Sequence, residues 1–346
     1  MRFLIMTDGM LLLFFILQSN SPLFVLAQTE TSQKIPSFPE NLSLLPWWGY
    51  VIILVLVVGC IYLISRKLKG KSRSNQGLNH DKKNEPITVR RQNLAVIPGN
   101  AQAIGSREEQ QDAFGFSDIN DEHFMSEYGV LAVLADGMGG LHGGREASHI
   151  AVQAFLEDYL HSRENTSIPE KLTTSLEAAN EKVLQFAYEN QLLGGIGTTL
   201  IASVVFQNQL YWLSVGDSRI YLIQGESITQ LTIEHKYAKE LDELAALGEI
   251  TQEEAKHDPQ RESLTSYLGL EKLELLDVSM EPIPLQKGDS IILCSDGLYG
   301  SVSNEEILEV CRYLPTQEAA EELISIALSK QLPHQDNATV AILTID

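Results

Sequence analysis

The sequence has few cysteines and few basic residues. Its three cysteines are too few for a disulfide framework or for a zinc site built from four thiolates. Lys and Arg total 25 against 46 Asp and Glu, which gives a net charge of −21. A protein that neutralises nucleic-acid phosphates needs a basic face, so we expect no nucleic acid among the partners. Any metal site in this chain would need mostly oxygen ligands.

The basic residues are concentrated near the N-terminus. Residues 1–93 contain 11 Lys and Arg and 5 Asp and Glu, which leaves 14 and 41 for residues 94–346, a net charge of −27 there. With 44% hydrophobic and 21% charged residues, the whole chain has the composition of a folded protein. The sequence therefore divides into a basic, partly apolar quarter and an acidic remainder.

Two apolar stretches in the first quarter predict contact with a membrane. The stretch 10–17 is short, and Val25-Leu26-Ala27 ahead of Gln28 resembles a signal-peptidase site, which favours a cleaved signal peptide over residues 1–27. The alternative is an uncleaved first span. The stretch 47–64 is uncharged over 18 residues, with Trp47 and Trp48 at one end and several Lys and Arg after the other. This pattern predicts a transmembrane helix whose C-terminal side faces the cytoplasm.

The predicted transmembrane helix places the segments on either side of it. Residues 28–46 are predicted to be a short extracytoplasmic segment, and residues 65–93 a basic cytoplasmic linker that faces the anionic inner leaflet. Gly70-Lys71-Ser72 imitates the end of a nucleotide-binding loop, but the required glycine five positions earlier is Ser65. We therefore expect a cell-membrane protein with one span, or two if residues 1–27 are retained, and a cytoplasmic domain at 94–346.

Residues 94–346 read as one mixed domain. Short runs rich in Val, Ile and Leu predict strands at 130–135, 199–206, 210–215, 219–223, 290–295 and 338–345. Helical patterns occupy 145–161, 169–190, 235–247, 304–313 and 317–330, with Pro169 and Ser303 as start signals. Strands come in hairpin-like clusters and helices in pairs. This order predicts an α+β fold of packed layers rather than a parallel sheet.

Four aspartates lie beside these strands. Asp136 follows the run 130–135, Asp296 follows 290–295, Asp336 comes before 338–345, and Asp112 lies in an acidic stretch further upstream. A single Asp-Gly pair is ordinarily a turn. Several carboxylates that converge at strand ends repel each other unless cations lie among them, and Mg²⁺ or Mn²⁺ prefers such oxygen ligands. Gly137 would let its own carbonyl approach a metal closely.

Six short motifs occur in order along residues 94–346. They are Arg107-x-x-x-Gln111-Asp112, Asp136-Gly137-Met138-Gly139-Gly140, Gly197-Thr198-Thr199, Gly216-Asp217-Ser218-Arg219, Ser295-Asp296-Gly297 and Asp336-Asn337. As a set they resemble the metal-dependent serine/threonine protein phosphatases of type 2C, in their bacterial form. Residues 231–269 resemble the flap subdomain of that family. The resemblance implies a four-layer α-β-β-α sandwich of two largely antiparallel sheets flanked by helices, here preceded by an N-terminal membrane anchor.

The resemblance also implies a role for each site residue. Two divalent cations, Mn²⁺ or Mg²⁺, would activate a water, with Asp136 bridging both and the Gly137 carbonyl completing one coordination shell. Asp296 and Asp336 would bind the other ion, and Asp112 would act mainly through water. Arg107 would clamp the substrate phosphate, which suits a planar guanidinium. The Gly197-Thr198-Thr199 and Gly216 to Arg219 motifs are expected to be scaffold.

Some positions depart from the family pattern. Met138 stands where many members have a histidine, so the leaving alkoxide must take its proton from water or another residue; His142 is the nearest histidine in the sequence. Neither Gly300 nor the stretch 192–196 supplies an acid for the family's third metal site. We therefore expect two tightly bound metals and a weak or absent third. Gln110 and Arg145 also differ from the usual residues, which puts substrate contacts in question.

The resulting function is a membrane-anchored phosphatase for phosphoserine and phosphothreonine in proteins, the targets of a bacterial Ser/Thr kinase. Two alternatives stay open at this stage. One is a pseudophosphatase that binds phosphoproteins without turnover. The other is a membrane-tethered adaptor whose acidic domain recruits basic partners.

Overall fold

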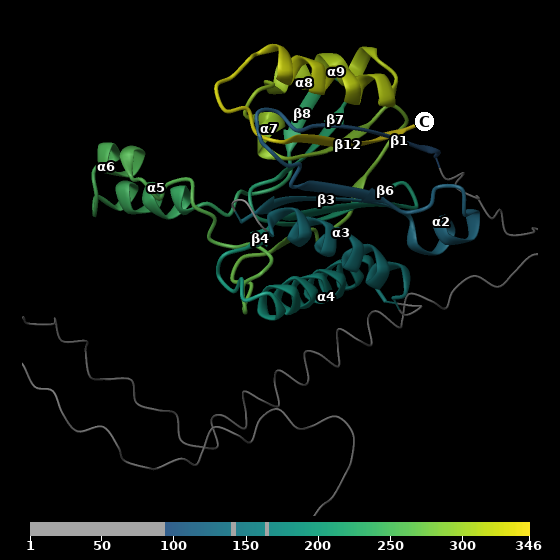
Figure 1. Cartoon of the computed structure of the whole chain (residues 1–346). Coiled ribbons are helices and arrows are strands. Elements are labelled where there is room, and N and C mark those ends of the chain that lie inside the picture. Colours follow the sequence, from purple (N-terminus) through teal and green to yellow (C-terminus); the bar gives the residue numbers. More distant parts are fainter. Residues whose placement is uncertain (1–93, 140–142, 163–165) are drawn as a thin grey trace, which may run out of the picture. The chain divides into compact units, whose positions relative to one another are not determined.

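The computed structural model describes residues 94–139, 143–162 and 166–346 (Figure 1). The predicted segments 1–27, 28–46, 47–64 and 65–93, and also His142, lie outside the described residues. Within the described part, no helix combines the length and apolarity needed to cross a bilayer. The predicted anchor and the predicted segment boundaries stay predictions.

The strands form two sheets. The first has the order β1 (Val96–Ala103), β12 (Ala338–Ile345), β11 (Ser290–Cys294), β7 (Arg219–Gln224) and β8 (Ser227–Gln230). The second has the order β10 (Ile283–Pro284), β6 (Gln209–Val215), β5 (Leu200–Phe206), β3 (Val130–Met138) and β2 (Asp112–Phe116), with β4 (Gly197–Thr198) paired to β3 and β9 (Asp277–Val278) paired to β6. The pairings between these strands are antiparallel, as predicted.

The strand β3 shows why the sheets pack face to face. Its side chains alternate between two environments, as the two-residue period of a strand requires. Leu131 and Val133 point into a core shared with helices, whereas Ala132 and Leu134 point into the core between the two sheets. All four are fully buried, so both faces of this strand are covered. An uninterrupted apolar run is the sequence signature of such a strand.

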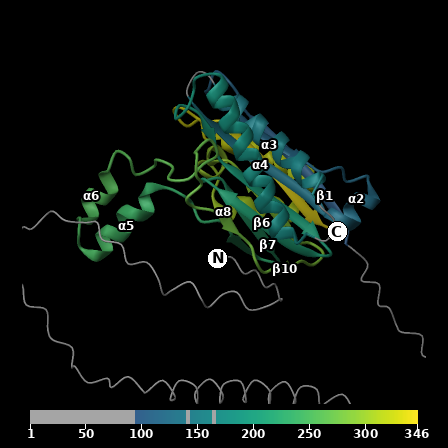
Figure 2. The ribbon, with the colours of Figure 1, turned by 90° about the horizontal axis from the view of Figure 1, so that it is seen from below.

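Helices cover the outer face of each sheet. The helices α3 (Gly144–Leu160) and α4 (Ile168–Glu189) pack on the second sheet, and α7 (Asp296–Tyr299), α8 (Asn304–Tyr313) and α9 (Thr316–Ser329) pack on the first (Figure 1). Figure 2 shows α3 and α4 side by side. The predicted four-layer α-β-β-α sandwich is therefore confirmed.

Three helices lie outside these layers. The helix α2 (Glu122–Tyr128) precedes β3, whereas α5 (Tyr237–Leu247) and α6 (Gln252–His257) stand beside the sandwich (Figures 1 and 2). Both belong to residues 231–269, here called the flap segment. Two isolated bridges, Lys236 with Leu264 and Thr198 with Leu268, tie the two ends of this segment together and to β4.

Candidate active site

A cleft of about 860 Å³ lies at the edge of the sandwich where the predicted acids meet. Its lining includes Arg107, Asp136, Gly137, Asp296 and Asp336. Asp112 lies behind them, 1% exposed, and is paired with Asp136 in the register of β2 and β3. The structure therefore brings together the residues that the sequence motifs singled out, although they are spread over more than two hundred positions of the chain.

The acids come from both sheets. Asp112 and Asp136 belong to β2 and β3 in the second sheet, whereas Asp296 follows β11 and Asp336 precedes β12 in the first. Asp136 shares the strand face of Ala132 and Leu134, which points between the sheets, so its carboxylate is directed into the gap where the two sheets end. The cleft thus lies where the ends of the two sheets meet.

The Gly197-Thr198-Thr199 motif holds the backbone of Asp136 on both sides. The N–H of Asp136 donates to Thr199 Oγ1 over 2.9 Å, and its carbonyl accepts from the Thr199 N–H and the Thr198 hydroxyl, each at 2.9 Å. Thr198 and Thr199 are buried, so these bonds are shielded from water. The scaffold role expected for this motif agrees with these contacts.

Gly137 leaves no room for a side chain. A Cβ at this position would lie 2.1 Å from the carbonyl oxygen of Gly144 and 2.7 Å from that of Gln111. The Gly137 N–H donates to the same Gln111 carbonyl over 3.1 Å, so a hydrogen bond holds the two backbone segments close together. Glycine is needed here because the backbone segments meet directly.

Asn337 organises the loop that carries Arg107. Its Oδ1 accepts from the Gln111 N–H over 2.8 Å, and its Nδ2 donates to the carbonyls of Ile104 and Glu109 over 2.9 and 3.1 Å.

Arg107 lies against Asp336, with 2.5 Å between Nη2 and Oδ2, and 55% of the Arg107 side chain remains exposed. The predicted phosphate clamp is thus at the cleft and accessible, and in this structure it forms an ion pair with a predicted metal ligand.

The pKa values of the buried carboxylates are raised. Burial raises the pKa of Asp112 to about 6 and that of Asp296 to about 7, and it raises the pKa of Asp136 well above its usual range. Repulsion from neighbouring carboxylates adds to each shift. Thr339, Ser295 and Asp136 lower the pKa of Asp112 and so oppose this shift; the Ser295 hydroxyl donates to Asp112 Oδ2 over 2.8 Å. These acids therefore have more negative charge among them than the protein compensates.

Two carboxylate oxygens at this site lack a partner. Asp112 Oδ1 and Asp296 Oδ1 are buried and accept no hydrogen bond. Within residues 94–139, 143–162 and 166–346, no three His, Cys, Asp or Glu side chains stand together as a finished metal-ligand set. Uncompensated carboxylates repel each other. Orphaned anionic oxygens from converging aspartates are nevertheless the donor set that a hard divalent cation takes.

Asp217 is the site residue that the sequence reasoning missed. It was assigned to the scaffold, but it lines the cleft, is 8% exposed, and its charge raises the pKa of both Asp136 and Asp296. Lys236 lies 3.2 Å from its carboxylate. A signal was present in the sequence, because Asp217 follows the apolar run 210–215 at a Gly, as Asp136 follows its own run.

The positions that depart from the family pattern lie around the cleft. Met138 lines it directly after Gly137, and Arg145 lies 3.5 Å from Glu109, another lining residue. Gln110 supports Asp112 instead of facing the cleft, since its Oε1 accepts from the Asp112 N–H over 3.0 Å.

Known proteins are similar to this chain in sequence and in fold. A family model described as protein phosphatase 2C matches residues 101–335. The serine/threonine phosphatase stp of Listeria monocytogenes is 32% identical over 224 residues, which are 62% of this chain and 84% of that protein. The serine/threonine protein phosphatase PstP of Mycobacterium tuberculosis is 35% identical over 234 residues, 67% of this chain and 43% of that protein.

A solved structure adds a likeness in three dimensions. The crystal structure of the catalytic domain of PstP in complex with two manganese ions matches with a TM-score of 0.57 at 30% identity. The match covers 73% of this chain and 100% of that one.

Proposed function

Since the chain belongs to the protein phosphatase 2C family and is a serine/threonine protein phosphatase, we propose that its activity requires two divalent cations, Mn²⁺ or Mg²⁺. The observation that carries this proposal is the group of aspartates whose pKa values are raised by burial and by repulsion from neighbouring carboxylates, and two of whose oxygens have no hydrogen-bond partner. The two manganese ions of the PstP structure support the same number of metals.

The proposed ligands are Asp136, the carbonyl of Gly137, Asp296 and Asp336, with Asp112 acting through water. When bound, the cations would supply Lewis acidity that brings the pKa of a water molecule near neutrality. The protein fixes the positions of the ligands: β3 is held by Thr198 and Thr199, and the tight contact at Gly137 sets the loop that follows. Rigid placement of this kind is what orients a reacting phosphate.

Arg107 is the proposed phosphate-binding residue. Its exposed guanidinium can donate to two phosphate oxygens without a large desolvation cost, and it is already held near the acids by Asp336. Met138 has no proton to transfer, so the leaving alkoxide would take its proton from water or another residue.

The test is hydrolysis of a phosphothreonine peptide with Mn²⁺ by the full-length protein in detergent. We expect Asp136→Asn to lose at least about a hundredfold in kcat, because a buried carboxylate that helps to hold the cations becomes neutral. Asp118→Asn is the matched control, since Asp118 is exposed and outside the cleft lining. Equal rates for Asp136→Asn and the control would refute the proposal.

We also propose that residues 47–64 anchor the protein in the cell membrane with the catalytic domain in the cytoplasm. Its substrates would be phosphoproteins made by a bacterial Ser/Thr kinase. The support for the anchor is the uncharged stretch with its aromatic and basic flanks. Full-length protein should stay with membranes through an alkaline carbonate wash, whereas a variant without residues 47–64 and 1–27 should be released. Release of the full-length protein would contradict the anchor.

A further inference from the structure

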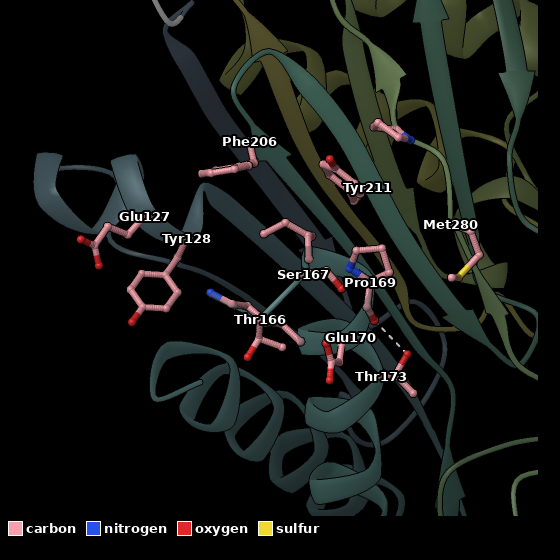
Figure 3. Close-up of a pocket in the computed structure, with 13 residues that line it drawn as sticks. Glu127, Tyr128, Thr166, Ser167, Pro169, Glu170, Thr173, Phe206, Tyr211 and Met280 are labelled. Carbon is pink, nitrogen blue, oxygen red and sulfur yellow. Dashed lines mark hydrogen bonds between the residues drawn. The ribbon is translucent and has the colours of Figure 1, made fainter. Parts of the chain in front are cut away.

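A second large cavity lies far from the cleft. It is a groove of about 990 Å³ at the start of β3, between the end of α2, the first turns of α4 and the β5–β6 hairpin (Figure 3). Tyr128 lies on one side of the groove, and Tyr211 and Met280 lie on the other (Figure 3). Asp136 is near the opposite end of β3, about 20 Å away at 3.3 Å per residue. The groove is therefore separate from the catalytic residues.

Lys171 supplies an unusual charge to this groove. The residue is 4% exposed, yet it lines the cavity, and its Nζ lies 4.1 Å from the centre of the Tyr128 ring. Phe124 stacks on the same ring at 4.7 Å, which fixes its orientation. Among the described residues, no carboxylate lies within ion-pair distance of this ammonium, and no oxygen accepts a hydrogen bond from it.

The ring face of Tyr128 compensates this ammonium only in part. A cation over an aromatic ring is attracted to it, but the ring accepts no directed hydrogen bonds from the three N–H donors. Burial lowers the pKa of Lys171, although the charge of Glu127 acts in the opposite direction. The ammonium is thus under-compensated and has donors left for a ligand.

The start of α4 adds backbone N–H donors beside Lys171. This helix has 22 residues, and the side chain of its N-cap Ser167 makes no capping hydrogen bond. The first turn of a helix has N–H groups without partners inside the helix, and it carries the positive end of the helix dipole. Ser167, Ile168 and Glu170 of this turn line the same groove as Lys171. Pro169 in this turn has no N–H, and the carboxylate of Glu170 offsets part of the dipole, so the N–H groups of Ile168 and Glu170 are what the turn offers an anion beside Lys171.

The other walls indicate what kind of anion fits. Phe206, Tyr211 and Met280 give the groove apolar surface, and Met280 is 72% exposed with nothing covering it among the described residues. Glu127 and Glu170 also line the groove and are exposed. Their charges repel a dianion such as a phosphate more strongly than a monoanion. The combination suits one negative charge attached to an apolar body.

We propose that this groove binds a small monocarboxylate with an aromatic or aliphatic body. The carboxylate would accept hydrogen bonds from Lys171 and the first turn of α4, and the apolar part would cover Tyr211 and Met280.

The experiment measures binding of phenylacetate to the full-length protein in detergent, by calorimetry and by ligand-observed NMR. Three probes each alter one property: phenylacetamide lacks the charge, acetate lacks the apolar body, and phenylmalonate carries two charges. We expect saturable binding of phenylacetate and at least about tenfold weaker binding of each of the other three, because a charge-assisted hydrogen bond or the apolar contact is lost or repulsion is added.

The matched variants are Lys171→Met and Lys182→Met. Both remove a lysine from α4, but Lys182 is exposed and does not line the groove. Lys171→Met should abolish the preference for phenylacetate over phenylacetamide, whereas Lys182→Met should keep it. Hydrolysis of a phosphothreonine peptide reports whether each variant is folded. Equal affinity of wild-type protein for the acid and the amide would overturn the proposal, and this comparison needs no variant. Unchanged phenylacetate binding in Lys171→Met would overturn it as well.

Discussion

His235 is a buried histidine whose neutral form is built into the structure. It is 4% exposed, and its Nδ1 accepts a hydrogen bond from the Gly216 N–H over 3.1 Å. Its Nε2 lies 3.8 Å from Asp277 Oδ2. Burial lowers the pKa of His235 below its usual value near 6.5, although Asp277 acts in the opposite direction. A proton on Nδ1 would remove the acceptor for Gly216, which directly precedes Asp217.

This histidine should make the protein sensitive to acid. Below about pH 6.5 the unfolded chain binds a proton at this position and the folded protein does not, so the free energy of unfolding falls as the pH drops. The buried aspartates of the metal-free protein act in the opposite sense, because their raised pKa values make the folded state the better proton binder. The contribution of His235 must therefore be measured as a difference between variants.

His235→Asn keeps an acceptor for Gly216 but cannot take up this proton. Between pH 7.5 and 5.5 we expect its free energy of unfolding to fall by on the order of 1 kcal/mol less than that of the wild type. Urea unfolding at the two pH values measures this difference. The exposed His257→Asn should behave like the wild type. An identical pH dependence for His235→Asn and the wild type would show that this histidine does not titrate as inferred.

Some residues of the cleft could be predicted from the sequence alone, and others could not. Asp136 and Asp296 were predictable because each follows an apolar run, and Asp336 because it comes just before one, where the strand fixes its place. Asp217 also follows an apolar run, but its Gly-Asp-Ser stretch is equally good turn sequence, so it was assigned to the scaffold. The contact of Arg107 with Asp336 could not be predicted at all, since it joins positions 229 residues apart. Such pairing depends on how the two sheets meet.

At the scale of elements, Lys236 connects the flap segment to the sandwich. It directly precedes α5, and its Nζ lies 3.2 Å from Asp217, 3.2 Å from Glu262 and 3.4 Å from Glu234. Its side chain is 14% exposed, so these contacts are only partly screened by water. One ammonium thus holds a cleft residue and both ends of the flap segment.

Replacing this lysine should loosen α5 and α6. In Lys236→Met the carboxylates of Asp217 and Glu262 lose their shared counter-ion, and removing one partner of a partly buried ion pair is destabilising. We expect proteolytic cleavage between residues 237 and 262 to become at least about tenfold faster, with a smaller change in the global unfolding transition. The control is Lys239→Met, since Lys239 is exposed on α5. Equal cleavage rates for the two variants would exclude the connecting role.

Long periodic elements were predictable, and short ones were not. The helix predicted at 304–313 has the same first and last residues as α8. Ser303 is its N-cap, as expected, and forms a capping box with Glu306. In contrast, β1 and β2 were missed, because they contain Pro98, Gly99 and Gly115 and depend on pairing with β12 and β3. Helix α6 was missed because a six-residue helix carries too little periodicity.

At the scale of the whole domain, metal binding should stabilise the fold. The proposed ligands belong to both sheets, and without cations their charges repel across the junction. At a hundred times its Kd, a cation adds about 2.7 kcal/mol, which for a domain of this size corresponds to a rise in Tm of about 5–10 °C.

Thermal unfolding with EDTA and then with excess Mn²⁺ measures this rise. Asp118→Asn should reproduce it and Asp136→Asn should not. Without metal, Asp136→Asn should be at least as stable as the wild type, because it removes a buried repelling charge. A Tm that does not respond to Mn²⁺ in the wild type would contradict this prediction.

The meeting of two sheets at one set of aspartates also bears on the lifetime of the protein. Proteases in a cell degrade chains in proportion to how often they open. A phosphatase whose halves are joined more firmly by cations would be degraded faster when those cations are scarce. Metal supply would then set the abundance of the enzyme as well as the turnover of each molecule, and metal starvation would be followed by a slow decline in the protein itself.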